Sequence, residues 1–198
     1  YLFNIDNNAF TDLKNSLGAI YIVRDPRNVV TSWSKFANVS IQKAADTLIK
    51  TTQFGGNLNV KEGSERSMVH MGTWNGNFQS WKSFKYQDRY LLIKYEDLIK
   101  DKEKTFRNAL IFIKNLSNGS FEVSDSKITK VIQEIEFEKL KKLEEKEGFP
   151  EASKIKSGKK IPFFRKGLSG QWKKNLDLKI INSIEKSCGK EMKELGYL

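Results

Sequence analysis

Residues 18–30 read GAIYIVRDPRNVV, and this stretch decides the fold class. Its first six residues form a continuous apolar run with β-branched and aromatic members, which is typical of a strand buried on both faces of a parallel sheet. Asp25 is a favoured N-cap residue and Pro26 a favoured first helical residue, so a helix is predicted to begin directly after the strand. A strand that leads into a helix through a short turn is half of a βαβ unit, and the stretch therefore predicts an α/β fold.

The rest of the chain fits this class. A second buried strand is predicted at residues 90–95, which read YLLIKY and precede a turn or helix at 96–98. Apolar residues at helical spacing predict further helices, and the stretches between them predict loops. The expected helices cover residues 26–37, 41–53, 67–84, 105–116, 125–138, 139–147 and 180–195, and the longest expected loops cover 54–65 and 148–164. Strands alternating with helices favour a parallel sheet flanked by helices.

The composition excludes several classes of protein. Hydrophobic residues make up 38% of the 198 residues, which is enough for a folded core. The longest apolar run, residues 17–23, is far shorter than the roughly 20 residues that a membrane span needs. The single cysteine, Cys188, excludes an intramolecular disulfide and suits a reducing compartment. We therefore expect one domain over residues 1–198, in the cytoplasm and without contact to a membrane.

The net charge of +11 indicates an anionic partner, and it is unevenly distributed. Residues 139–174 hold twelve Lys and Arg against four Asp and Glu, so most of the surplus lies in this stretch. A solvated helix followed by a basic loop would show the same pattern. The charge alone is compatible with a nucleic acid, an anionic membrane or a small polyanionic ligand.

Arg24 is the first candidate for an anion contact. It lies at the carboxyl end of the predicted strand and just before a predicted helix, which is where open α/β sheets bind ligands. The free N–H groups of a helix start favour anions, and the planar guanidinium matches phosphate oxygens. Ser32, eight residues further along, could add a hydroxyl donor if a phosphate lies along this helix. The alternative is an exposed loop arginine and a serine on a polar helix face.

The second candidate is the sequence Arg165-Lys166-Gly167. Two adjacent cations suit a phosphate, and a glycine lets backbone N–H groups approach an anion closely. The alternative is a basic surface loop anchored by Phe163 and Trp172.

Three segments resemble, in order, motifs of the cytosolic-type sulfotransferase family. They are residues 21–32 (YIVRDPRNVVTS), 95–98 (YEDL) and 165–173 (RKGLSGQWK), and residues 192–198 resemble the end of bacterial members. This resemblance implies transfer of a sulfonate from 3′-phosphoadenosine 5′-phosphosulfate (PAPS) to a hydroxyl or amine of a small-molecule acceptor. It further implies adenosine 3′,5′-bisphosphate (PAP) as product, no metal, and a parallel sheet related to that of P-loop kinases and NTPases.

The resemblance also implies the roles of individual residues. Arg24 and Ser32 match residues that hold the 3′-phosphate of the donor. Tyr95 matches a residue at the adenine, and Phe137 matches an aromatic residue that stacks near it, although both could equally be core residues. A second clamp on the same 3′-phosphate is implied for Arg165, Lys166 and the backbone of Gly167.

Two family motifs have no match in this sequence. They are a P-loop-like segment, whose lysine stabilises the bridging oxygen, and a Lys-Thr-His segment, whose histidine is the general base. Both precede the Arg-Asp-Pro turn in the family, so we expect them upstream of Tyr1. His70 matches neither family histidine and is expected on a helix surface. The chain then represents the C-terminal two-thirds of one sulfotransferase domain, lacks the first strand, and is inactive alone.

Other functions stay open at this point. The chain could be a non-catalytic nucleotide-binding protein that keeps the 3′-phosphate contacts, or a basic domain that binds nucleic acid without a recognised module. A kinase has no support, because residues 1–198 contain no Gly-x-x-x-x-Gly-Lys-Ser/Thr loop. The acceptor pocket is expected at the loops 54–65 and 148–163. Loss of an upstream strand predicts exposed apolar strand residues and marginal solubility.

Overall fold

The computed structural model describes residues 2–3, 8–50, 54–55, 69–149, 153–154, 160–164 and 170–198. The strands are β1 (Ala19–Val23), β2 (Phe54–Gly55), β3 (Val69–His70), β4 (Tyr90–Lys94), β5 (Ser153–Lys154) and β6 (Lys160–Ile161). The α-helices are α1 (Pro26–Phe36), α2 (Ile41–Lys50), α3 (Trp74–Trp81), α4 (Tyr95–Lys100), α5 (Lys102–Ser117), α6 (Asp125–Glu134), α7 (Phe137–Glu147), α8 (Trp172–Asn175) and α9 (Leu178–Glu194), and a 3₁₀ helix covers Lys82–Gln87.

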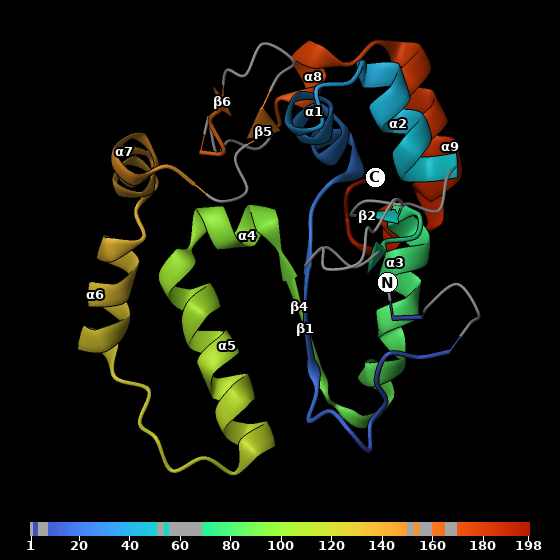
Figure 1. Cartoon of the computed structure of the whole chain (residues 1–198). Coiled ribbons are helices and arrows are strands. Elements are labelled where there is room, and N and C mark those ends of the chain that lie inside the picture. The colour runs from blue at the N-terminus through green and yellow to red at the C-terminus, as the bar shows by residue number, and fades with distance from the viewer. Residues whose placement is uncertain are drawn as a thin grey trace, which may run out of the picture.

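The two predicted strands form the centre of the fold. β1 and β4 pair in parallel, with Val23 opposite Lys94 at their carboxyl ends. Helix α3 lies against β1 on one side of this pair and α5 against β4 on the other (Figure 1). The short pairs β2–β3 and β5–β6 are antiparallel and two residues long per strand. The structure thus confirms an α/β fold with a parallel pair flanked by helices.

The main core lies around the junction of β1 and α1, where helices α2, α3 and α9 pack together. Helix α1 begins where the sequence predicts it, because the Asp25 side chain accepts a hydrogen bond from the backbone N–H of Arg27. Helix α9 begins in the same way at Asp177, whose side chain accepts from the N–H of Ile180. Their apolar faces meet in one buried cluster, formed by Val23, Val30, Ala44, Ala45, Ile49, Trp74, Phe78, Leu176, Ile180, Ile184, Cys188, Met192 and Leu195.

Several expected boundaries are wrong. The helix expected over 67–84 begins only at Trp74, because Thr73 caps it by accepting from the N–H of Gly76. His70 therefore lies in β3 and not on a helix. Helix α5 starts three residues earlier than expected because Asp101 caps it. The helix expected to run to residue 138 ends at Glu134, and a separate helix starts at Phe137.

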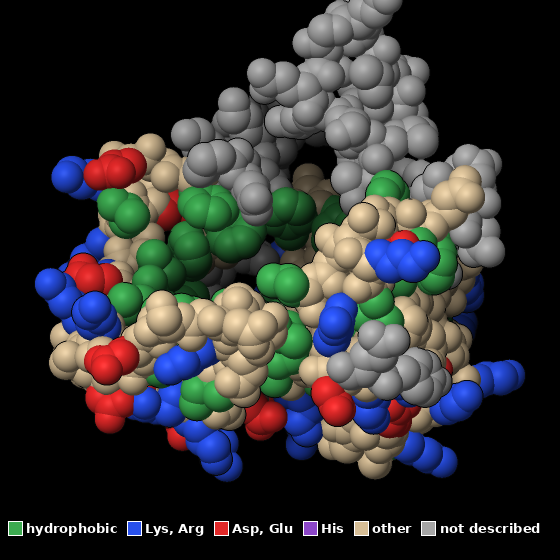
Figure 2. Space-filling model, turned by 90° about the horizontal axis from the view of Figure 1, so that it is seen from below, with side chains coloured by type: hydrophobic (Ala, Val, Ile, Leu, Met, Phe, Trp, Pro, Cys, Tyr) green, Lys and Arg blue, Asp and Glu red, His purple; other side chains and the backbone are tan. Residues whose placement is uncertain are grey.

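The expectation that β1 is buried on both faces is also wrong for this structure. Ile20 is 41% and Ile22 58% exposed, whereas Val23 at the strand end is buried. Among the described residues β1 pairs with β4 alone. Figure 2 shows a hollow on the lower face of the molecule, lined by hydrophobic side chains with charged ones at its margin. These exposed isoleucines agree with the expected incomplete cover of the sheet, while the upstream strand itself stays a prediction.

Candidate nucleotide site

Arg24 and Tyr95 lie together because β1 and β4 are parallel and in register. Each residue directly follows a strand, and the last residues of the two strands, Val23 and Lys94, are partners. The guanidinium carbon of Arg24 lies 4.2 Å from the centre of the Tyr95 ring. A guanidinium over an aromatic face at this distance is attracted to the ring. Two residues assigned to different parts of one nucleotide therefore form one unit at the carboxyl edge of the sheet.

The backbone of Arg24 is held by a hydrogen bond from helix α3. The indole N–H of Trp74 donates a hydrogen bond of 3.1 Å to the Arg24 carbonyl. Trp74 is buried at the start of α3, and its ring lies 6.5 Å from that of Phe78, centre to centre. The turn that carries Arg24 is thus fixed to the core by a tryptophan from a distant part of the chain.

Ser32 lies on the exposed face of α1, two turns beyond Arg24. The neighbouring hydroxyls are occupied by the helix itself, since Thr31 donates to the Asn28 carbonyl and Ser34 to the Thr31 carbonyl. Both of these side chains are buried, whereas Ser32 is exposed. Of the three hydroxyls, Ser32 is the one that faces solvent and can reach a ligand lying along the helix.

Phe137 belongs to a cluster of phenylalanines next to the basic segment. Its ring meets that of Phe164 edge to face, with centres 6.2 Å apart. Phe164 also meets Phe149, and the backbone N–H groups of Phe163 and Phe164 both donate to the Glu144 carboxylate. The structure therefore places Phe137 beside the residue that directly precedes Arg165.

The three remaining predicted contacts, Arg165, Lys166 and Gly167, lie outside the described residues. The description resumes at Gly170, which has a φ of +76° that favours glycine. Trp172 begins helix α8 two residues later. Of the described residues that flank this segment, Phe164 lies among the phenylalanines and α8 packs against α1.

Arg27 is a polar residue of this region that the sequence reasoning missed. It is 6% exposed and donates hydrogen bonds to Asp25, Glu185 and the Tyr197 carbonyl. Burial acts to lower the pKa of its guanidinium, but the two carboxylates outweigh burial and raise that pKa, so the group stays charged. One signal was available in the sequence, since a cation in the first turn opposes the helix dipole and needs a partner.

The last residues of the chain close over the same edge of the sheet. The Tyr197 hydroxyl donates to the Glu96 carboxylate at 2.9 Å, and the Lys94 ammonium donates to the Leu195 carbonyl at 3.0 Å. Burial raises the pKa of the Tyr197 phenol, and the Glu96 charge raises it further, so the phenol keeps its proton. The tail thus contacts residues on both sides of Tyr95.

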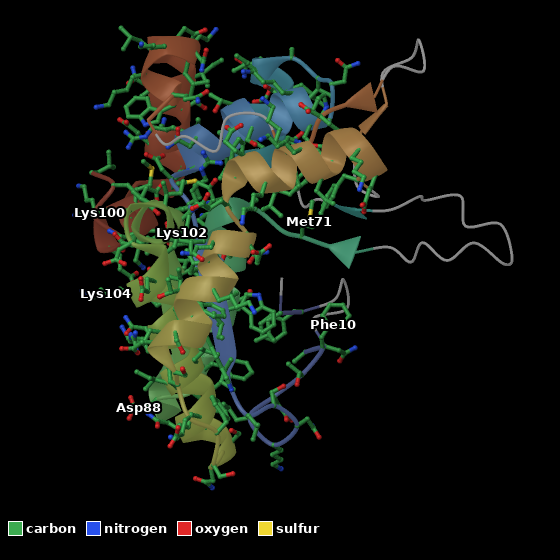
Figure 3. All side chains as sticks on the ribbon, turned by 90° about the vertical axis from the view of Figure 1, so that its left-hand side faces the viewer. Phe10, Met71, Asp88, Lys100, Lys102 and Lys104 are labelled. Carbon is green, nitrogen blue, oxygen red and sulfur yellow. The ribbon has the colours of Figure 1, made fainter. Side chains whose placement is uncertain are left out.

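A pocket of about 330 Å³ lies beside β1, whose residues Tyr21 and Ile22 contribute to its lining. The side chains of Tyr21, Trp33 and Trp74 contribute aromatic walls, and the lining is completed by Ile22, Val29, Thr47, Leu48, Met71, Gly72, Thr73 and Asn77. The Tyr21 hydroxyl donates to the Asn77 amide oxygen at 3.0 Å, and burial raises the pKa of this phenol. Figure 3 labels Met71, which directly follows β3.

Neither a metal-binding cluster nor a membrane-spanning helix occurs among the described residues. These residues contain no group of three or more His, Cys, Asp or Glu side chains arranged to hold a metal ion. None of their helices combines the length and the apolarity needed to cross a bilayer.

Known proteins resemble this chain in sequence and in structure. Sulfotransferase 1E1 of Cavia porcellus is 27% identical over 65% of this chain and 41% of its own length, and sulfotransferase 2A6 of Mus musculus is 27% identical over 84% and 53%. The crystal structure of mouse sulfotransferase SULT7A1 complexed with PAP superimposes with a TM-score of 0.59 at 21% identity, covering 89% of this chain and 58% of that one.

A retinol dehydratase in complex with androsterone and the inactive cofactor PAP superimposes with a TM-score of 0.66 at 17% identity, covering 96% of this chain and 51% of that one. This chain therefore spans about half the length of the relatives that it matches. The sequence profile of the sulfotransferase domain matches residues 10–196. The match includes every residue assigned above to the nucleotide site, and the chain belongs to the sulfotransferase domain family.

Proposed function

We propose that the protein is a sulfotransferase that moves a sulfonate from PAPS to a hydroxyl or amine. In this proposal residues 1–198 belong to one domain and supply the 3′-phosphate and adenine side of the donor site. One observation carries the proposal: Arg24 lies against Tyr95 at the carboxyl edge of a parallel strand pair, with the exposed Ser32 on the helix that follows. We assign these positions to the donor nucleotide because the chain belongs to the sulfotransferase domain family.

The chemistry assigned to this chain is binding and orientation. The bond between sulfur and the bridging oxygen of the 5′-phosphate breaks, and sulfur forms a new bond to the acceptor oxygen or nitrogen. The acceptor atom loses its proton to a base, and the bisphosphate leaves. Arg24, Ser32 and the segment 165–167 hold the far end of the nucleotide, while Tyr95 and Phe137 contact the adenine. Such a transfer depends mainly on positioning and on charge stabilisation.

Recognition of a 3′-phosphate distinguishes this donor from ATP, which has none. The purified chain should therefore bind adenosine 3′,5′-bisphosphate about 100-fold more tightly than adenosine 5′-monophosphate, because charge-assisted hydrogen bonds contribute about 1.5–3 kcal/mol each. Isothermal titration calorimetry with both nucleotides measures the ratio. Equal affinities would refute the proposal, and so would a gel shift at physiological salt in which an oligonucleotide displaces the bisphosphate.

We also propose that the pocket beside Tyr21 takes the apolar body of the acceptor. The described residues that line it carry no charge, and its aromatic walls suit an uncharged ring. Trp74 connects the pocket to the nucleotide site, because it lines the pocket while its indole N–H donates a hydrogen bond to the Arg24 carbonyl. The loops first expected to form the acceptor site lie largely outside the described residues. A small-molecule acceptor in the cytoplasm is the partner that we propose.

Two of the four tryptophans line this pocket, so binding can be followed by their fluorescence. We expect saturable quenching by uncharged 2-naphthol and at least about tenfold weaker quenching by anionic 2-naphthoate, because an apolar pocket penalises an unpaired charge. Thr47→Phe, which fills the pocket from α2, should abolish quenching and leave bisphosphate affinity unchanged. Equal quenching by the two probes, or by wild type and Thr47→Phe, would contradict the assignment.

A further inference from the structure

Arg27 joins four separate parts of the chain through one guanidinium. It donates to both carboxylate oxygens of Asp25 and to the Glu185 carboxylate, at 2.7 Å, in helix α9. It also donates to the Tyr197 carbonyl at 2.9 Å in the C-terminal tail. Its carbon lies 3.9 Å from the centre of the Trp172 ring in α8. The planar fork and the flat face of arginine are thus both used, which an ammonium cannot reproduce.

These contacts bear on the nucleotide site from two directions. Asp25 receives the guanidinium and also caps α1 by accepting from the backbone N–H of Arg27, so the ion pair fixes the turn that carries Arg24. Trp172 follows the basic segment 165–167 by five residues and is stacked on the same guanidinium. Arg27 therefore links the turn that carries Arg24 to the start of helix α8.

The tail completes this arrangement. Arg27 binds the carbonyl of Tyr197, while the hydroxyl of the same residue donates to Glu96, which directly follows Tyr95. The C-terminus accordingly lies close to the point where β1 runs into α1 (Figure 1). Because the guanidinium and Asp25 are both about 7% exposed at their side chains, loss of one would leave the other buried without its counter-charge.

We propose that Arg27 is a positioning residue of the nucleotide site, which fixes the turn that carries Arg24. It acts through Asp25 on one side and Trp172 on the other, without touching the nucleotide itself. This inference rests on the proposed function, since it assumes that Arg24 holds the 3′-phosphate. Its consequence is that Arg27 controls discrimination for the 3′-phosphate more than nucleotide affinity as such.

Arg27→Lys tests this, because lysine keeps the charge but loses the fork and the stacking. We expect the affinity ratio of adenosine 3′,5′-bisphosphate to adenosine 5′-monophosphate to fall about tenfold, with the monophosphate affinity within about twofold of wild type. Arg107→Lys is the matched control, since Arg107 pairs with Glu103 and Asp125 away from the site and its replacement should leave the ratio unchanged. Circular dichroism establishes that each variant is folded.

Trp172→Leu keeps the ion pairs and removes the stacking, so it gives the same readout if Arg27→Lys does not fold. A folded variant that keeps the wild-type ratio, or that loses affinity for both nucleotides in parallel, would overturn the inference. A wild-type protein that does not distinguish the two nucleotides would instead overturn the proposed function. The two failures are therefore told apart by the wild-type titration alone.

Discussion

Arg24→Ala is expected to weaken the binding of adenosine 3′,5′-bisphosphate about 100-fold while changing the affinity for adenosine 5′-monophosphate less than about threefold. The Arg24 guanidinium carbon lies 4.2 Å from the centre of the Tyr95 ring and the Arg24 carbonyl is held by Trp74, so the position of Arg24 is fixed before a ligand arrives. Little ordering entropy is then lost on binding, and the charge-assisted contact contributes almost fully. Calorimetry with both nucleotides measures the two changes.

Adding Arg165→Ala to Arg24→Ala is expected to weaken bisphosphate binding further. Combined with Arg165→Ala, Arg24→Ala should make bisphosphate binding undetectable, because two of the assigned cations are then missing. Arg107→Ala removes an arginine from α5 and should leave both affinities as they are, which controls for the lower net charge. Equal binding by the double variant and the wild type would remove Arg24 and Arg165 from the site.

Variants at Tyr95 test whether its aromatic ring or its hydroxyl prepares Arg24 for the phosphate. Phenylalanine keeps an aromatic face under the guanidinium, whereas leucine does not, so the bisphosphate affinity should follow the ring and not the hydroxyl. This comparison belongs to the same titration and shows whether the stacking seen in the structure prepares Arg24 for the phosphate.

The part of the site that the sequence predicts is the part that depends on local chemistry. The turn Arg24-Asp25-Pro26 could be identified because capping by Asp25 and the fixed φ of proline act within a few residues. The contact between Arg24 and Tyr95 was not predicted, because it depends on the parallel pairing and register of β1 and β4, which only the structure shows.

Long-range contacts could not be predicted in this way. Arg27 binds residues 158 and 170 positions away, and no periodicity in the sequence links a first-turn arginine to Glu185 or Tyr197. The apolar run of β1 likewise shows that its side chains favour burial, but not what covers them, and Ile22 is 58% exposed here. Which element covers a strand, and which residues a buried arginine binds, depend on tertiary contacts. A hydrophobic pattern in the sequence does not specify these contacts.

Phe78→Ala is expected to lower the free energy of unfolding by about 3–5 kcal/mol, the range for removing a large aromatic side chain from a core. Phe78 is 1% exposed in α3, and its ring lies 5.9 Å from that of Tyr21 on β1, centre to centre. It therefore fills the space between helix and sheet that the substitution would leave empty. Urea denaturation should show a lower midpoint with an unchanged slope, because the surface exposed on unfolding is nearly the same.

Phe10→Ala is the matched control, since Phe10 is 66% exposed and lies on the N-terminal segment away from the helices (Figure 3). This change should alter the free energy of unfolding by less than about 0.5 kcal/mol, as is usual for surface positions. Similar losses in the two variants would mean that the space between α3 and β1 is not a packed core. Because Phe78 also stacks on Trp74, which holds the Arg24 carbonyl, the same core would then no longer account for the fixed position of the nucleotide site.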